Sequence, residues 1–235
     1  MVATTPATTG PSAPRSVAEH WIKNNVLAAI LAGVVSVCLY GVRQATGAAD
    51  GSAGSAAIVV HYIAAVGLWA FWGAASSVLT GVVLQRIVPR LPVWTWIGLH
   101  VAGAVTVGVG LEMAFLAAPR DAVATDDTSL QATLMLGLML GAVLGAVAGT
   151  LEALVLRRVA FGTPAWIVYS TLGFAVSWSF TLMCAGLLGL GTDFVSELVS
   201  DVLALPSTLI MALIMLPALK RLKSSTLSAV AQHFS

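Results

Sequence analysis

Charged residues are scarce in this sequence: Asp, Glu, Lys and Arg together make up 9% of its 235 residues. Soluble globular domains carry roughly a quarter of such residues, so the composition excludes that class. The net charge is +1 and no segment concentrates Lys or Arg. Because nucleic-acid binding depends on a basic patch or stripe, we expect no nucleic-acid partner.

Cysteine is nearly absent, and recognisable catalytic motifs are missing. Cys38 and Cys184 stand in apolar stretches without a second Cys at CxxC spacing or a neighbouring His, which indicates neither a disulfide nor a zinc site. No HExxH, GxSxG, P-loop or GxGxxG sequence occurs, so protease, hydrolase and nucleotide-binding functions have no support. We therefore expect no metal and no cofactor, and favour a protein that is not an enzyme.

Apolar residues dominate instead, at 58% of the chain with a mean hydropathy of +0.95. A helix needs about 20 consecutive apolar residues to cross the hydrocarbon core of a bilayer. Runs of that kind, separated by Gly, Pro and Asp, cover 25–46, 56–87, 93–118, 129–159, 163–190 and 196–219. The sequence thus predicts an all-α integral membrane bundle of six transmembrane helices at 25–219, preceded by a disordered tail at 1–24 without the features of a signal peptide and followed by a tail at 220–235.

The basic residues predict how the bundle sits in the membrane. With six crossings, one side holds Arg15, Lys23, Arg86, Arg90, Arg157, Arg158, Lys220, Arg221 and Lys223, while the other holds Arg43 and Arg120 with most of the acidic residues. Loops rich in Lys and Arg stay in the cytoplasm. We therefore expect a multipass protein of a bacterial plasma (inner) membrane with both termini cytoplasmic.

A weak internal repeat accompanies the helices. Sliding the chain by 72 residues places 73–104 on 145–176 with eight identities in 32 positions, among them Arg86/Arg158, Pro92/Pro164 and Trp94/Trp166. This indicates a duplicated helical hairpin with both copies in the same orientation, unlike inverted transporter repeats. The shared basic ends also follow from the rule that positive loops stay inside.

The segment 145–166 combines a helix of small residues, the sequence Leu-Val-Leu-Arg-Arg at 154–158 and Pro-Ala-Trp at 164–166. In this it resembles a group of uncharacterised bacterial multipass membrane proteins. Those proteins usually carry a Gln-Trp pair before the Leu-Val-Leu-Arg segment, where this chain has Glu152-Ala153. The resemblance implies a multipass membrane fold and no particular activity.

Small residues at helical spacing predict how the helices pack. Residues four apart share one helix face, and such a face lets another helix approach closely in a membrane. The residues concerned are Gly137, Gly141, Gly145 and Gly149, with a shorter row at Gly73, Ser77 and Gly81. We favour packing within the chain, and a homodimer contact is the alternative.

Ionisable residues inside the spans are the main functional clue, because a charge at the centre of a membrane helix costs about 2.5–3.5 kcal/mol on insertion scales. Arg43, His61, Glu112 and Asp201 are expected near the outer side, and we hypothesise that they line an outward-facing polar pocket. One alternative is an ion pair of Arg43 with Glu112 or Asp201 that only lets each charge be buried. In a second alternative, the Arg43 and Asp201 side chains extend to water.

A second ionisable group is expected near the inner side. Glu152 is predicted to pair with Arg86 or Arg90 of the neighbouring hairpin, since Arg157 and Arg158, five and six residues on, are poorly placed for a pair on the same helix face. His100 is interpreted as a hydrogen-bonded interior histidine.

Three functional hypotheses follow. The first is a small-molecule transport or ligand-binding membrane subunit, which resembles in size and topology the six-helix subunits that borrow an ATPase from a partner. The second is a structural or assembly protein that packs through its glycine-rich faces, with a partner membrane protein or a second copy. The third is an intramembrane acid–base enzyme that uses Glu112 or Asp201.

Overall fold

The computed structural model describes residues 13–48, 54–117, 130–190 and 194–224, and within them it confirms the predicted six-helix, all-α bundle. The helices are α1 (Ala13–Thr46), α2 (Ser55–Ile87), α3 (Val93–Ala117), α4 (Leu130–Leu156), α5 (Thr163–Leu187) and α6 (Phe194–Arg221). All six are long and apolar enough to cross a membrane. Helices suit this environment because they satisfy every backbone hydrogen bond within one segment.

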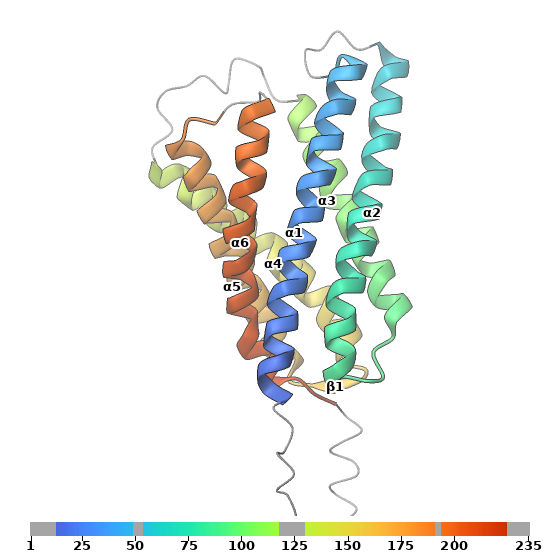
Figure 1. Ribbon diagram of the computed structural model, residues 1–235, viewed down its shortest axis with the longest axis vertical. Helices are drawn as coiled ribbons and strands as arrows, with labels where there is room; N and C mark the ends of the chain where they lie inside the picture. The colour runs from blue at the N-terminus through green and yellow to red at the C-terminus, as the bar shows by residue number, and fades with distance from the viewer. Residues whose placement is uncertain (1–12, 49–53, 118–129, 191–193, 225–235) are drawn as a thin grey trace, which may run out of the picture.

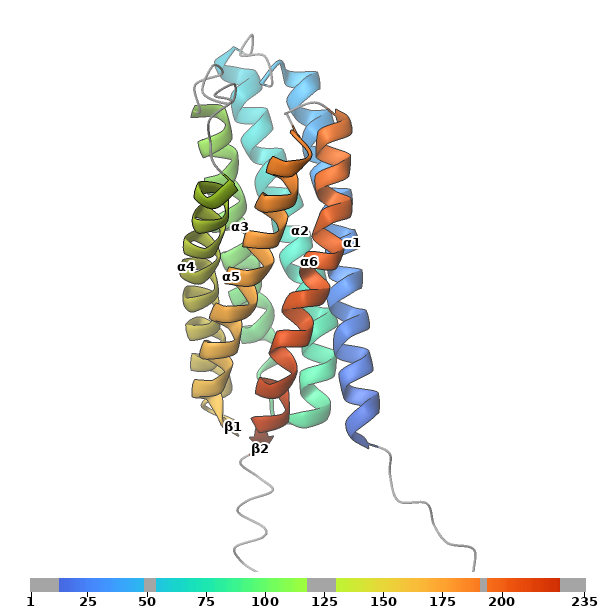
Figure 2. The same cartoon turned by 90° about the vertical axis from the view of Figure 1, so that its left-hand side faces the viewer.

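The helices run up and down side by side, and the lower end in Figures 1 and 2 holds both the start of α1 and the end of α6. Going round the bundle, neighbours in contact are α3, α2, α1, α6, α5 and α4. The contact between α4 and α5 is the most extensive, whereas the one between α3 and α4 is much the smallest. The bundle is therefore an arc of helices that α3 and α4 close only loosely.

Two short strands mark the lower end, which we call the strand end. Strand β1 (Ala160–Phe161) follows α4 and pairs antiparallel with β2 (Lys223–Ser224), which follows α6. Gly162 makes the turn into α5 with φ +86°, and a Cβ there would overlap the backbone carbonyl of Arg221. Only glycine fits a left-handed conformation that close to another backbone.

The structure corrects the predicted boundaries of the membrane domain. Helix α1 begins at Ala13, so 13–24 is helical and not part of a disordered tail, and Trp21 is buried at 4% exposure. At the other end, α6 includes Lys220 and Arg221, and β2 follows it. The apolar runs mark only the part of each helix that crosses the hydrocarbon core, and α1 and α6 continue beyond that part. Residues 1–12 and 225–235 lie outside the described residues.

The glycine rows pack within the chain. Gly137, Gly141, Gly145 and Gly149 are all buried, and a Cβ on Gly137 or Gly145 would lie 2.6 Å from backbone atoms of α5. Such contacts draw the α4 and α5 backbones together and gain dispersion energy that lipid does not provide. In α2, Gly73 packs in the same way on α3, where a Cβ would lie 2.8 Å from the carbonyl oxygen of His100, while Ser77 is fully buried and Gly81 faces Trp96.

The two hairpins differ in register. Gly73 lies over Val101, whereas Gly145 lies over Thr171, two residues earlier than a shift of 72 would place it. The internal repeat remains a sequence-based prediction.

A buried apolar cluster fills the strand end and supplies most of the core. It includes Trp21 of α1, Leu84 of α2, Trp96 of α3, Leu156 of α4 and Trp166 of α5. Trp166 lies at its centre, with ring centroids 5.9 Å from Trp21 and 6.4 Å from Trp96 in edge-on geometry. Edge-on contact is a favoured arrangement of aromatic rings, so three tryptophans join α1, α3 and α5.

Candidate functional site

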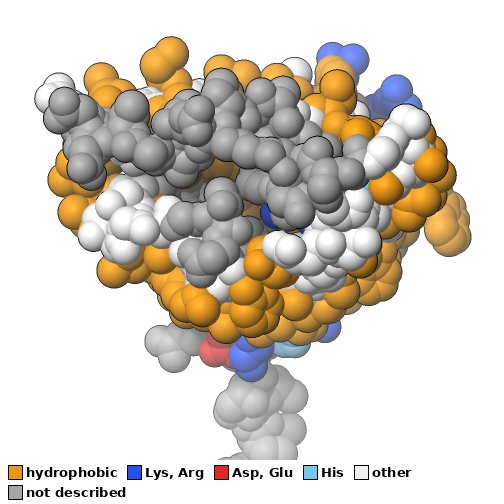
Figure 3. All heavy atoms as spheres, turned by 90° about the horizontal axis from the view of Figure 1, so that it is seen from above, with side chains coloured by type: hydrophobic (Ala, Val, Ile, Leu, Met, Phe, Trp, Pro, Cys, Tyr) orange, Lys and Arg blue, Asp and Glu red, His pale blue; other side chains and the backbone are white. Residues whose placement is uncertain are grey.

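The outside of the bundle is apolar, as expected for a surface that faces lipid. Large hydrophobic side chains such as Ile63, Met139 and Val168 are more than half exposed, and hydrophobic atoms form most of the rim in the view from above (Figure 3). Buried polar side chains are few by comparison. Each buried ionisable group therefore needs a physical reason for being there.

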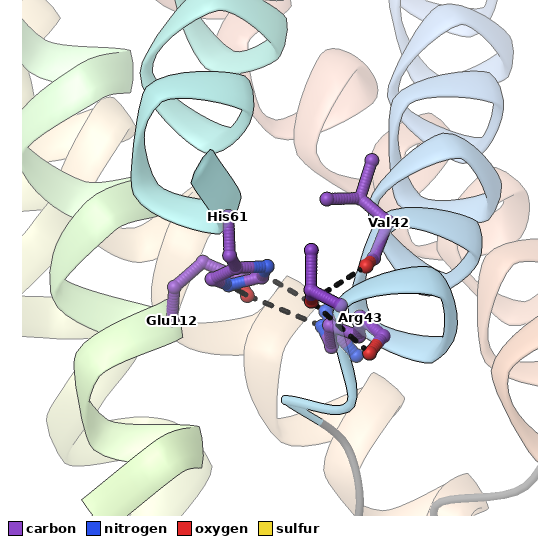
Figure 4. A network of polar contacts seen from close by, with 5 residues as sticks. Val42, Arg43, His61 and Glu112 are labelled. Atoms are coloured by element: carbon purple, nitrogen blue, oxygen red, sulfur yellow. Dashed lines mark hydrogen bonds and ion pairs between the residues drawn. The ribbon is translucent and has the colours of Figure 1, made fainter. Parts of the chain in front are cut away.

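Three of the predicted outer residues form one hydrogen-bonded network, which we call the outer network. Arg43 of α1 donates to Glu112 of α3 twice, from Nε at 3.1 Å and from Nη2 at 3.0 Å. His61 Nε2 of α2 lies 3.0 Å from Glu112 Oε2. Figure 4 shows the Arg43 and His61 side chains directed at the same carboxylate. Their residues are 8%, 0% and 3% exposed for Arg43, His61 and Glu112, so the network is buried.

Helical spacing explains why these side chains meet. Val35, Leu39 and Arg43 stand four apart on one face of α1, and His61 and Ala65 do so on α2. Val35, Leu39 and Ala65 form a second small core cluster. This cluster lies closer to the strand end than the outer network does. The faces of α1 and α2 that carry Arg43 and His61 are therefore the faces that pack inward. The sequence held that signal in the i, i+4 spacing of the apolar residues.

The hydrogen-bond inventory fixes the role of each atom in the outer network. A guanidinium has no acceptor, so Arg43 donates both bonds and Glu112 accepts them as an ionised, bidentate partner. His61 Nε2 then donates to the same carboxylate, because an ionised carboxyl group has no proton to give. Its other nitrogen, Nδ1, is buried and has no hydrogen-bond partner within the described residues.

Asp201 does not belong to the outer network at the depth that the sequence suggested. It packs against α1 at Gly33, where an added Cβ would lie 3.5 Å from Asp201 Cβ. Gly33 is ten residues, about 15 Å of helix, below Arg43. The expected group of four is thus corrected to three. Counting residues from predicted boundaries misplaced Asp201, because it stands seven residues after the start of α6 but lies at the height of Gly33, thirteen residues before the end of α1.

The partner predicted for Glu152 is also corrected. Glu152 of α4 lies 3.0 Å from His100 Nε2 of α3, and it accepts a 2.6 Å hydrogen bond from Trp166 Nε1 of α5. Arg86 and Arg90 are exposed instead. Arginines at helix ends extend toward the polar surface, whereas Glu152 stands four residues inside the end of α4 and points into the bundle.

His100 is held on both sides of its ring. Nδ1 lies 2.9 Å from the backbone carbonyl oxygen of Trp96, one turn earlier on α3, and Nε2 faces Glu152. The Trp96 ring lies against the imidazole with centroids 4.4 Å apart. We call His100, Glu152 and Trp166 the inner network. Its His–Glu side chains are 19% and 17% exposed, compared with 0% and 4% for His61 and Glu112 in the outer network.

The described residues of α3 and α4 line a groove of about 480 Å³. Its walls are almost wholly apolar, from Val107 and Leu111 of α3 to Met139 and Val143 of α4, with Trp178 of α5. It therefore lies where the arc of helices closes loosely, on the lipid-facing side. No cluster of three or more His, Cys, Asp or Glu within the described residues is placed to hold a metal ion.

Comparison of the chain with protein-family models, with curated proteins and with solved structures finds no match.

Proposed function

We propose that the protein is a small-molecule transport or ligand-binding subunit of a bacterial plasma membrane, with the outer network as its outward-facing polar site. The observation that carries the proposal is a carboxylate, a guanidinium and an imidazole from three helices in one buried network of a membrane bundle. Buried Asp, Glu, Arg and His in membrane spans characteristically mark substrate paths and proton relays.

The outer network has the chemistry for this role. The Arg43 fork matches a carboxylate or phosphate, and Glu112 now occupies it with that geometry. His61 Nδ1 presents a buried nitrogen that no described residue binds. Because Nε2 of His61 donates to Glu112, a neutral imidazole leaves Nδ1 as an acceptor, so the network combines an anion site with a buried nitrogen that can accept a hydrogen bond from a ligand.

The predicted orientation fits the same proposal. Lys23, Arg86, Arg90, Arg157 and Arg158 are exposed at the strand end, which we take as the cytoplasmic end with both termini. The outer network then lies near the opposite, external surface.

A structural role for the outer network is the second candidate, and one observation favours it. Both oxygens of Glu112 have donors, as in an ion pair that only holds α1, α2 and α3 together. The glycine face of α4 is covered by α5 within the chain, so assembly with a partner would need another surface.

Native mass spectrometry of the protein in mild detergent, with transport in liposomes, separates the two candidates. The test variant is Arg43→Met with Glu112→Leu, because replacing both members of a buried pair by apolar groups of similar size is often neutral for stability. Arg86→Gln at the exposed strand end is the matched control.

Under the transport proposal, the wild type and the control retain a bound small molecule in native mass spectrometry, or they move protons in the liposome assay. In that assay, small anions, amines or neutral solutes are added to liposomes that contain a pH-sensitive dye. The folded double variant loses that property. A co-purified ATPase would identify the energy source. A folded wild type without bound molecule and without response to any solute contradicts transport and supports the structural role.

A further inference from the structure

The partners of both ring nitrogens of His100 determine where its protons must lie. The atom beside its Nδ1 is a backbone carbonyl oxygen, which only accepts. Nδ1 must therefore carry a proton. A neutral imidazole has one N–H, so in that form Nε2 would turn a lone pair toward the Glu152 oxygen 3.0 Å away.

Two lone pairs at that distance repel unless a proton lies between them. It stands either on Nε2, as an imidazolium paired with a carboxylate, or on Glu152, as a carboxylic acid that donates to a neutral imidazole. Both arrangements contain the same number of protons and carry no net charge. We propose that the His100–Glu152 pair is a proton-binding site, which holds one exchangeable proton between the two side chains.

The surroundings favour a held proton. Trp166 Nε1 donates to the second oxygen of Glu152 and so fixes the carboxyl group toward His100. The Trp96 and His100 ring centroids are 4.4 Å apart with the rings tilted by 44°, and an aromatic ring with its centroid within about 6 Å attracts a cation. Neither Trp side chain titrates, so the proton belongs to the pair.

The other charged or titratable groups at the strand end are mostly cations that face water. The described ones on the surrounding elements are Glu19, His20 and Lys23 of α1, Arg86 and Arg90 after α2, Arg157 and Arg158 after α4, Tyr169 of α5, and Lys220, Arg221 and Lys223 at the end of α6. Apart from His20 and Tyr169, these side chains are exposed. Their positive charge opposes an imidazolium, but charges in water are screened over about 8–10 Å at physiological salt.

The outer network provides an internal comparison. There Arg43 already neutralises Glu112, and His61 faces one acceptor only. One ring proton on His61 is enough for that geometry. The inner pair needs two protons, one on His100 Nδ1 for the Trp96 carbonyl oxygen and one between Nε2 and Glu152. The difference follows from Arg43, because the partners of Glu152 among the described residues are His100 and Trp166 and include no arginine.

The two networks share helix α3. Glu112 and His100 are twelve residues apart, which is about 18 Å along a helix. If the protein transports small molecules as proposed, the inner pair would lie on a proton path through the bundle. Protons would reach it from the strand end, because its side chains are more exposed than those of the outer network. The proton site itself does not depend on that function.

Nitrogen-15 NMR of histidine-labelled protein in lipid nanodiscs tests the site without any ligand. The signals of His100 are assigned as those lost in His100→Gln. At neutral pH we expect both ring nitrogens to be protonated, unless the proton stands on Glu152, and we expect the pair to lose this second proton on alkaline titration. His61 serves as the control and keeps one protonated nitrogen. Infrared spectroscopy reports the alternative location, as a carboxylic acid band that disappears in Glu152→Gln.

The variant Glu152→Gln should reduce His100 to one ring proton, while its amide oxygen still accepts the Trp166 hydrogen bond. If this variant does not fold, the wild-type titration alone decides. A wild-type His100 with a bare Nε2 and no carboxylic acid band overturns the proposal, whatever the transport assays show. Transport without this proton leaves the proposed function standing and removes only the inner site.

Discussion

At the scale of single residues, two networks inside this bundle each place a carboxylate beside a group that can cancel its charge. Arg43 balances Glu112 near one end, and a proton shared with His100 would balance Glu152 near the other. Burial of an isolated charge is far more costly than burial of a hydrogen-bonded pair. In each pair, one group thus reduces the free-energy cost of burying the other inside the membrane.

The first prediction concerns the loss of one member of such a pair. In Glu112→Gln the Arg43 guanidinium stays buried without its counter-charge, and removal of one partner of a buried pair costs about 3–5 kcal/mol. We expect the free energy of unfolding, measured by titration with a denaturing detergent, to fall by that order. The double variant Arg43→Met, Glu112→Leu should recover most of the loss.

A change of less than about 0.5 kcal/mol in Glu112→Gln would be typical of a surface substitution. That result would mean that water or a bound ion already compensates Arg43, and the outer network would no longer explain how α1, α2 and α3 hold together.

At the scale of helices, the α4–α5 contact depends on glycine. A Cβ on Gly141 would overlap the carbonyl oxygen of Phe174 and lie 2.7 Å from Ala175 Cα. Both obstacles are backbone atoms, which do not move aside as a flexible side chain would. The contact is therefore intolerant of even one methyl group.

We accordingly expect Gly141→Ala to destabilise the protein by about 1–3 kcal/mol, the usual cost of overpacking. Gly103→Ala on α3 is the matched control, because nothing lies within 4 Å of its Cβ position and alanine favours a helix by about 1 kcal/mol over glycine. Unfolding in detergent compares the two variants. Equal stability of both would show that α4 and α5 separate freely in the membrane.

At the scale of the whole molecule, the sequence allowed the architecture to be predicted, because apolar runs of membrane length and the glycines between them mark the helices directly. The contacts of α4 were also foreseeable, since Gly137 to Gly149 share one face. The partners of Glu152 could not be predicted, because opposite charge alone favours the arginines that lie at a similar depth. Which side chains meet depends on helix rotation, and His100 and Trp166 reach Glu152 from two different helices.

The depth of Asp201 shows the same limit along the helix axis. Its distance from a predicted boundary could be read from the sequence, but the relative heights of α1 and α6 could not, because they depend on how the two helices pack against each other along their axes. Grouping residues across a bundle from sequence therefore needs the helix offsets, which hydropathy does not contain.

The orientation of the molecule gives the last prediction. Gly54, at the start of α2, and Arg90, in the turn between α2 and α3, are both exposed at opposite ends of the bundle. In a background with Cys38 and Cys184 replaced by Ala, we expect Gly54→Cys to react with a membrane-impermeant maleimide added to intact cells. Arg90→Cys should react only after the membrane is opened, because basic ends remain in the cytoplasm. The reverse pattern would place the strand end outside, and the outer network would then open toward the cytoplasm while the His100–Glu152 pair faced the exterior.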